Sequence, residues 1–122
     1  MKIRNDVALM YLNLLTGFIE KGYKGKFGYV LTVNLRKIKE SLQEFLNTRN
    51  ELIMKYGEKK DENYFLNQED KGKYKKFIEE ITPLATIEQH IDIMKIPANE
   101  VWDQLDSEAM IQLEWMLDEP QN

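Results

Sequence analysis

The hydrophobic residues near the start of the chain repeat with a helical spacing. Over residues 6–21 they fall at i, i+3, i+4 and i+7, the stripe of an amphipathic helix with one buried face. The residues of this stripe are Val7, Met10, Tyr11, Leu14, Leu15 and Phe18. Asn5 or Asp6 can cap the start of this helix, and Gly22 can end it in a left-handed conformation.

A much longer helix is predicted from about 27 to 56, closed by Gly57. Its apolar positions alternate spacings of four and three residues, which is typical of a coiled-coil seam. The seam residues are Leu31, Leu35, Ile38, Leu42, Phe45, Arg49, Leu52 and Tyr56. A helix of that length measures about 45 Å, more than the diameter of a globule of this size. We therefore expect an elongated body or a second subunit, with residues 31–52 of the seam as candidates for self-association.

Arg49 is the one charged residue in this seam, and it has two interpretations. Its stem can pack in the seam while its guanidinium reaches solvent. Alternatively, it pairs with an acid across the seam and sets the register.

Residues 57–72 are polar and predict a loop, in which 64–66 can form a short strand. A second amphipathic helix is expected from about 69 to 81, ended by Pro83, because proline disfavours helical geometry in the residue before it. Residues 87–96 alternate in polarity and predict a strand. The residues expected on its apolar face are Ile87, Gln89, Ile91 and Ile93.

A lone strand is unstable, so we expect residues 87–96 to pair with 64–66 or with their own copy in another subunit. Two short helices are predicted at 100–105 and 108–118, the second capped by Asp106 or Ser107. The expected fold is a single α+β domain over residues 1–122. It is predominantly α, with one long central helix, shorter helices and a minor strand or hairpin.

The formal net charge of −4 hides an uneven distribution. Residues 1–60 carry 12 Lys and Arg against 6 Asp and Glu, a net of +6, whereas residues 61–122 carry 5 against 15, a net of −10. Three interpretations stay open: the halves neutralise each other within the fold, they associate between copies, or the basic half meets a phosphate-bearing ligand. From this division and the long seam we expect a homo-oligomer.

Candidate catalytic groups are scarce. The chain has no cysteine, which removes disulfides, thiolate metal ligands and thiol nucleophiles. The serines, Ser41 and Ser107, lie far in sequence from the single histidine, His90. Glu88, His90 and Asp92 alternate on one strand face and can bind a metal weakly, but an exposed polar face explains them equally well. We expect no enzyme activity, metal or cofactor.

The composition also bears on location and on macromolecular partners. Apolar stretches fall well short of the roughly 20 residues of a membrane span, and the N-terminus lacks a secretory segment, so no membrane association is expected. The acidic balance argues against generic nucleic-acid binding. Arg36, Lys37 and Lys39 form a basic stripe, although Glu40 and Glu44 can neutralise it by surface pairing.

The turn at residues 22–28 is the most suggestive segment for ligand binding. Its three glycines leave backbone amides accessible, and the following helix directs its positive dipole end toward them. The candidate phosphate- or nucleotide-binding residues are Tyr23, Lys24, Gly25, Lys26, Phe27, Tyr29 and Arg36. The alternative is a helix cap followed by a tight interhelical turn.

Several stretches resemble a family of short phage and prophage proteins of unknown function from Gram-positive hosts. They read KFGYV, NLRKI, RNELI with KYG, FIEEI, IEQHIDI and LEWML, at residues 26–30, 34–38, 49–53 with 55–57, 77–81, 87–93 and 113–117. The resemblance covers most of the chain, implies a phage protein, and supplies no catalytic residues.

Two functions follow from the resemblance and the composition. The first is a non-catalytic phage accessory protein of the host cytoplasm, which evades host defence by sequestering a nucleotide signal or binding a host protein. The second is a virion structural or assembly protein, such as a tail or connector accessory.

Overall fold

The first amphipathic stretch forms helix α1 (Asn5–Glu20) in the computed structural model, which describes residues 1–119. Ala8, Leu15 and Phe18 form its buried face, whereas Met10 is 59% exposed. The position of the helix is confirmed within one residue, but its buried face is rotated away from part of the predicted stripe. Gly22 follows the helix with φ of 79°, the predicted left-handed geometry.

The predicted long helix is divided at Leu42 into α2 (Gly25–Ser41) and α3 (Gln43–Tyr56). Nε2 of Gln89 donates a hydrogen bond to the Ser41 carbonyl at 3.1 Å. This carbonyl therefore bonds to a side chain, and a side chain that inserts in this way interrupts the regular hydrogen bonding of a helix. The prediction of one continuous helix was therefore wrong, although its outer limits lie close to those of the pair.

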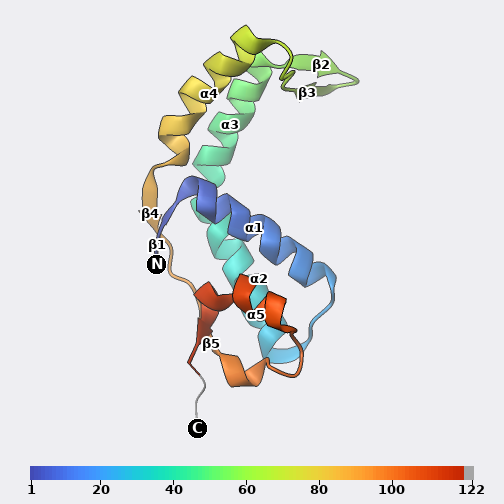
Figure 1. The fold of residues 1–122 in the computed structure, drawn as a ribbon, viewed down its shortest axis with the longest axis vertical. Coiled ribbons are helices and arrows are strands. Elements are labelled where there is room, and N and C mark those ends of the chain that lie inside the picture. Colours follow the sequence, from blue (N-terminus) through green and yellow to red (C-terminus); the bar gives the residue numbers. More distant parts are fainter. Residues whose placement is uncertain (120–122) are drawn as a thin grey trace.

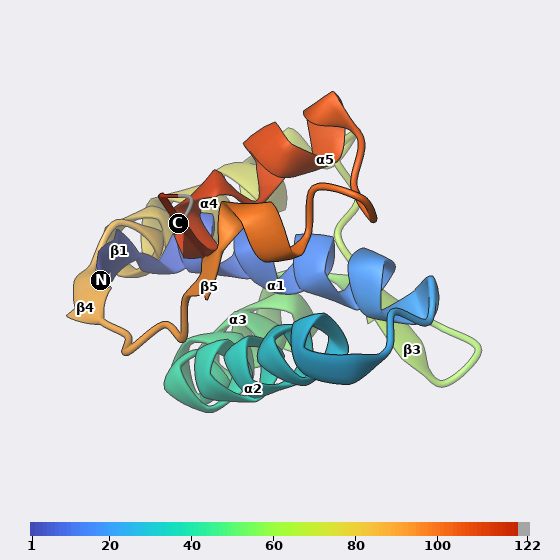
Figure 2. The same cartoon turned by 90° about the horizontal axis from the view of Figure 1, so that it is seen from below.

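The helices are arranged as a body and a projecting arm (Figure 1). The arm consists of α3 and α4 (Lys71–Ala85), which run antiparallel, and at its tip a hairpin of β2 (Glu58–Lys60) and β3 (Asn63–Phe65). The body consists of the remaining elements. Figure 2 shows that α1 lies between α2 and the C-terminal segment. The fold is thus a mostly helical α+β arrangement with an elongated shape.

Helix α4 continues two residues beyond Pro83, so the predicted stop was wrong. Proline lacks only one backbone N–H, and near the end of a helix this removes a single hydrogen bond. Thr82 Oγ1 donates to the Ile78 carbonyl at 2.6 Å, and the Thr86 amide donates to the Thr82 carbonyl at 3.2 Å. These two bonds hold the last turn around the proline.

The best predicted strand is much shorter than expected and has a different partner. Within 87–96, β4 covers Glu88–His90, and Ile96 belongs to a separate short strand. β4 pairs antiparallel with β1 (Lys2–Arg4), with Ile3 opposite Gln89. The predicted pairing with 64–66 is wrong, since β3 pairs with β2, and pairing with a second copy stays a prediction. The sequence did not reveal β1 as the partner, because β1 is too short to show an alternating pattern of its own. The alternation still predicted the correct faces for Gln89 and Ile91, which are covered, but not for Ile87, which is exposed.

The C-terminal segment returns across the body. After the 3-10 turn η1 (Ala98–Glu100) comes α5 (Ser107–Gln112), then η2 (Glu114–Met116). Asp106 caps α5 by accepting a hydrogen bond from the Ala109 amide at 2.8 Å, as predicted. The predicted helices at 100–105 and 108–118 are otherwise too long.

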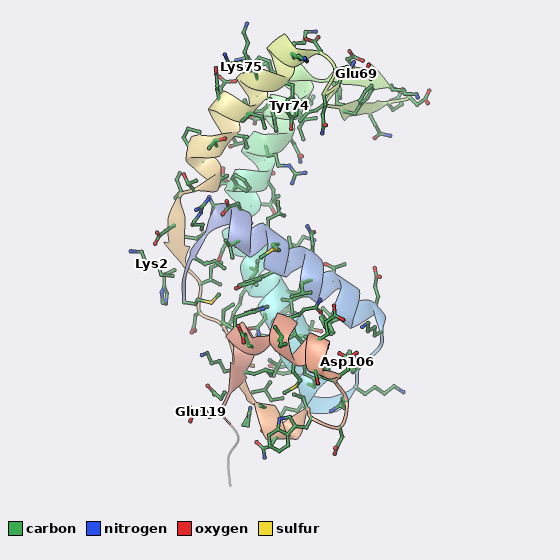
Figure 3. The ribbon with its side chains drawn as sticks, viewed as in Figure 1. Lys2, Glu69, Tyr74, Lys75, Asp106 and Glu119 are labelled. Atoms are coloured by element: carbon green, nitrogen blue, oxygen red, sulfur yellow. The ribbon has the colours of Figure 1, made fainter. Side chains whose placement is uncertain are left out.

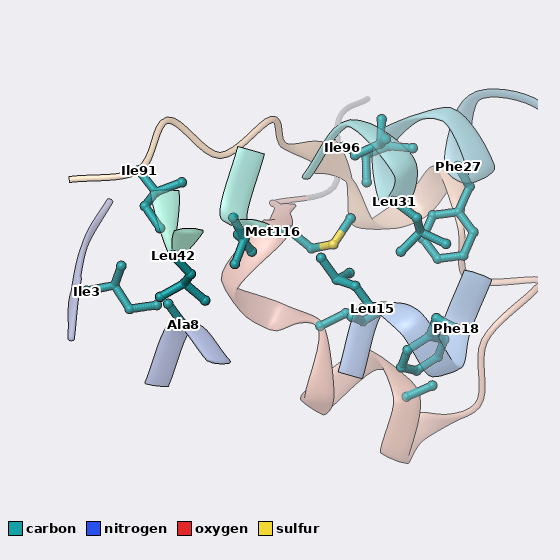
Figure 4. Close-up of a cluster of buried hydrophobic side chains, with 14 of the residues drawn as sticks. Ile3, Ala8, Leu15, Phe18, Phe27, Leu31, Leu42, Ile91, Ile96 and Met116 are labelled. Carbon is teal, nitrogen blue, oxygen red and sulfur yellow. The ribbon is translucent and has the colours of Figure 1, made fainter. Parts of the chain in front are cut away.

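The segment closes with a parallel pair of short strands, β5 (Ile96–Pro97) and β6 (Leu117–Asp118). The main core lies where α1, α2 and this segment meet, and includes Leu15, Phe27 and Met116 (Figure 4).

Asn34 is the most completely buried polar residue of this core, with 0% of its surface exposed. Its side-chain Nδ2 donates to the Met94 carbonyl at 2.9 Å, and its Oδ1 accepts from the Met94 amide at 2.8 Å. The amide side chain thereby satisfies both backbone groups of an irregular segment that has no strand partner at this point.

A polar network joins the body to the arm. Gln89 Nε2 donates to Asn5 Oδ1 at 2.7 Å as well as to the Ser41 carbonyl, and Asn5 Nδ2 donates to the Leu84 carbonyl at 3.0 Å. The side chains of Asn5 and Gln89 therefore connect the start of α1 and the strand β4 to the ends of α2 and α4. Asn5 is used here, and not as the predicted helix cap.

Replacing Gln89 by methionine is expected to lower the free energy of unfolding by about 1–3 kcal/mol, because the change leaves buried acceptors without a donor. Urea unfolding measures this loss, and combining Gln89→Met with Asn5→Ala should cost less than the sum of the two single changes. The control is Gln68→Met at an exposed loop position. Strict additivity would contradict the network.

The hairpin turn at the tip of the arm is strained. Asp61 and Glu62 both have positive φ, 51° and 74°, the pattern of a type I′ turn that favours Asn-Gly. We expect the double change Asp61→Asn, Glu62→Gly to stabilise the protein by about 1 kcal/mol, since left-handed backbone is unfavourable for Glu. Thermal unfolding measures the gain, and Glu62→Ala, which keeps the strain, should give none.

Candidate functional site

The glycine turn is a closely packed connection between α1 and α2. Phe27 is only 2% exposed, and the Tyr23 ring meets it edge-on with 4.9 Å between ring centroids. A Cβ on Gly28 would collide with the Tyr23 carbonyl oxygen, so this glycine permits a close backbone contact. Gly25 has a φ of 71° and begins α2. The geometry of the turn matches the interhelical alternative.

The candidate phosphate-binding residues are not gathered around one cavity. Lys26 donates from Nζ to Glu100 Oε1 at 2.9 Å. Lys24, Tyr29 and Arg36 are exposed, but Arg36 lies eleven residues beyond Gly25, or about 16 Å along the helix. A phosphate-binding role stays a prediction for these exposed residues.

The predicted seam is covered by the chain itself. Leu31, Ile38 and Leu42 are 0% exposed, and Phe45 is 8% exposed. These four side chains offer no surface to a second copy. Leu35, Arg49 and Leu52 are half-buried, and self-association through them stays a prediction.

The two halves of the charge distribution meet within the fold. The ion pairs that join the halves are Lys2–Glu88, Lys26–Glu100, Lys37–Asp92 and Lys55–Glu80. All of them are exposed, so each contributes little to stability. Their presence favours the interpretation that the basic and acidic halves neutralise each other.

The candidate catalytic groups are dispersed or already paired. His90 Nδ1 lies 3.5 Å from the N-terminal amine, while its neighbours Glu88 and Asp92 pair with lysines. Lys55 has a raised pKa, mainly through its hydrogen bond to Tyr56 and then through Glu80, so it stays protonated and is a poor nucleophile. Across residues 1–119, His, Asp and Glu form no group of three that could hold a metal ion.

An apolar groove follows α1 beside α5. It consists of two adjoining hollows of about 510 and 270 Å³. The groove is lined by Met10, Tyr11, Asn13, Leu14, Gly17, Phe18, Lys21 and Gln112. Both hollows share Asn13, Leu14 and Gln112, so they form one continuous surface.

One wall of the groove is built by α5 and the turn after it. Trp115 stacks on Tyr11 with 4.3 Å between ring centroids and 4° between ring planes, and its Nε1 donates to the Gln112 carbonyl at 2.9 Å. Ala109 and Leu113 bury the inner side of this segment. The outer side presents Ile111, which is 68% exposed, between the exposed polar residues Glu108 and Gln112. The wall is therefore firmly anchored and carries both an apolar and an acidic side chain at its surface.

Gly17 lies in the last turn of α1, three residues before the helix ends, and lines the groove. A glycine inside a helix costs roughly 0.5–1 kcal/mol relative to alanine. A Cβ added to Gly17 would meet nothing within 4 Å, and its φ is not positive. Neither backbone geometry nor packing within the described part of the chain explains this glycine. It leaves open space on the surface of the groove.

Sequence reasoning missed this groove. Met10 and Leu14 were assigned to the buried stripe, and Trp115 was expected in a longer helix. The one local signal was Gly17, a helix-destabilising residue near the end of an otherwise strong helical pattern.

The fold and the groove together define a mostly helical α+β protein with an exposed apolar groove. No helix within residues 1–119 has the length and apolar character needed to cross a membrane. No family model matches the chain, and comparisons with curated proteins and with solved structures found no significant match.

Proposed function

We propose that this chain is a non-catalytic binding protein whose groove along α1 docks a segment of another protein. The observation that carries the proposal is the unexplained space at Gly17, in the floor of a continuous apolar groove. Met10, which lines the groove, is 59% exposed, and Ile111, next to the lining residue Gln112 in the chain, is 68% exposed. Contiguous exposed apolar surface of this kind is typical of protein interaction sites.

The shape and chemistry of the groove favour a protein segment over a small polar ligand. Small-molecule sites enclose most of their ligand and direct several polar groups toward it. This groove is elongated and open, and the polar side chains that line it belong to Tyr11, Asn13, Lys21 and Gln112. Lys21 is held over the Phe18 ring, with Nζ 4.8 Å from the ring centroid, at one end of the groove.

The resemblance to phage proteins supplies the biological setting of this proposal. We propose that the protein acts in the host cytoplasm and evades host defence by binding a host protein. The alternative function is a virion or assembly accessory, which the elongated shape with its arm also suits. Mass spectrometry of purified virions distinguishes the two, because a host-directed protein is expected to be missing from particles and assembly intermediates.

Photo-crosslinking in host cells tests the docking proposal. A photo-reactive amino acid at position 112 should give a defined adduct with a partner protein, because Gln112 lines the groove. Gly17→Leu should abolish this adduct by filling the groove. Gly72→Leu is the matched control, since Gly72 lies in the first turn of α4 and meets only Asp70 at 3.9 Å.

A second photo-reactive position compares the groove with the glycine turn. Residue 24 is exposed in the turn, outside the residues that line the groove. Adducts from position 24 but not from position 112 would contradict the groove as the binding site. Sequestration of a nucleotide has its own test: isothermal titration with cyclic and ADP-ribose-type nucleotides should show binding tighter than millimolar that Lys24→Ala weakens.

A further inference from the structure

We infer that the partner segment is an amphipathic helix with a narrow apolar seam flanked by lysine and arginine. This inference rests on the proposed docking function of the groove and adds the chemistry of the occupant. It is drawn from three features: the line of the groove along a helix, the close approach allowed at Gly17, and the charge of the α5 wall.

The line of the groove fits a helix. Met10, Leu14, Gly17 and Lys21 follow one another at spacings of four, three and four residues, so they form a single ridge line on α1. From Met10 to Lys21 this line extends about 16 Å, or three turns of a partner helix. A partner segment in strand conformation would have to bond to unpaired backbone donors and acceptors on this protein. The backbone groups of α1 and α5 bond mainly within their own helices.

Gly17 sets how closely that helix can approach. Packed helices usually lie 8–10 Å apart, and the distance falls when the side chains at the crossing are small. The space at Gly17 allows the partner backbone, or a large side chain from it, to rest directly on α1. The same space explains why alanine, the better helix former, does not stand at this position.

The negative charge of the α5 wall favours a partner helix with lysine and arginine on its flanks. Glu108 lies four residues before Gln112 and three before Ile111, so it shares their face of α5. No ion pair of the described residues uses Glu108. Over residues 98–119 the segment that carries this wall holds seven acids and no lysine or arginine.

A second copy of the chain is a poorer occupant. An isologous contact at Gly17 would bring two acidic walls toward each other, and like charges at an interface are unfavourable. A basic helix from another protein would meet opposite charge at Glu108 on this wall, which increases both its association rate and its specificity.

Selection from a displayed library of helices tests this inference. The library presents helices of about 18 residues, roughly 27 Å long, with a fixed leucine and alanine seam and flanks randomised among Lys, Glu and Gln. Wild-type protein is the bait, and Gly17→Leu protein removes helices that bind elsewhere. Gly72→Leu protein serves as the matched bait that should retain binding.

We expect the retained helices to be enriched in lysine on the flanks. Glu108→Lys should weaken them by about threefold to tenfold and Glu108→Gln by less, as for the loss of exposed charge pairs. Glu119→Lys is the control for net charge, because Glu119 lies away from Asp106 and the start of α5 (Figure 3).

Each other outcome overturns a defined part of the proposals. Helices that are sensitive to Gly17→Leu but not enriched in lysine would overturn the basic partner and leave the docking groove intact. The absence of any helix sensitive to Gly17→Leu would overturn the groove as well. A protein dimer in sedimentation that dissociates on Gly17→Leu would assign the groove to a second copy.

Discussion

Replacing Asn34 by aspartate is expected to destabilise the protein by about 3–5 kcal/mol at neutral pH, as for an uncompensated buried charge. One carboxylate oxygen can still accept from the Met94 amide. The other replaces the Nδ2 group, which now donates to the Met94 carbonyl at 2.9 Å. An ionised carboxylate there would face a carbonyl oxygen inside a core position that is 0% exposed. Urea unfolding measures the loss.

The size of this loss is expected to depend on pH. Burial and the facing carbonyl raise the pKa of the introduced carboxyl above its ordinary value of about 3.9. Between the unfolded and folded pKa values the native state then holds the proton more tightly than the unfolded state. The stability of Asn34→Asp therefore falls as pH rises above about 4, by up to 1.36 kcal/mol per pH unit.

Asn34→Leu is the matched control, because it removes both hydrogen bonds with Met94 and introduces no titratable group. Its stability relative to the wild-type protein should stay constant between pH 4 and pH 8, a range set by the carboxyl pKa. A loss for Asn34→Asp that did not vary with pH would contradict the described contact with Met94.

Replacing Phe27 by alanine is expected to lower the free energy of unfolding by about 3–5 kcal/mol, the range for a buried aromatic side chain. Phe27 is 2% exposed and packs against Tyr23, in the core between α1 and α2 (Figure 4). Chemical denaturation measures the effect. Phe27→Leu, which keeps most of the apolar volume, should cost less.

Tyr29→Ala is the control for this prediction, because Tyr29 is 63% exposed and two residues away. Its effect should stay within about 0.5 kcal/mol. If Phe27→Ala were as mild as Tyr29→Ala, Phe27 would be a surface residue, and its sequence-based role as a stacking face for a nucleotide would regain support.

Local periodicity predicted the helices well, but it could not reveal interactions between distant residues. α1 was located within a residue because its stripe, cap region and Gly22 all lie inside one segment. The division at Leu42 depends on Gln89, which is distant in sequence but hydrogen-bonds Ser41. The pairing of β1 with β4 is similar: its two strands come from opposite parts of the chain, and neither has enough residues for a pattern.

The candidate site was less predictable than the fold for a related reason. The three glycines of the turn predicted a phosphate-binding site, yet Gly28 is required by a backbone contact with Tyr23. The groove arises only when α5 and Trp115 fold onto Tyr11, about a hundred positions apart in the chain. Gly17 was visible in the sequence, but its meaning depends on the empty space around it.

The thin packing of the arm has a consequence for how the protein opens. Among the described residues, all side chains less than 2% exposed belong to the body or to the junction at Leu42. The arm relies on Phe45, Phe77 and Ile81, each 7–8% exposed, and on half-buried neighbours. Segments with few shielded contacts unfold locally at lower free energy than the whole chain. Among the helices, we therefore expect the α3–α4 pair to exchange its amide protons first and to give a protease access first, while the grooved body stays folded.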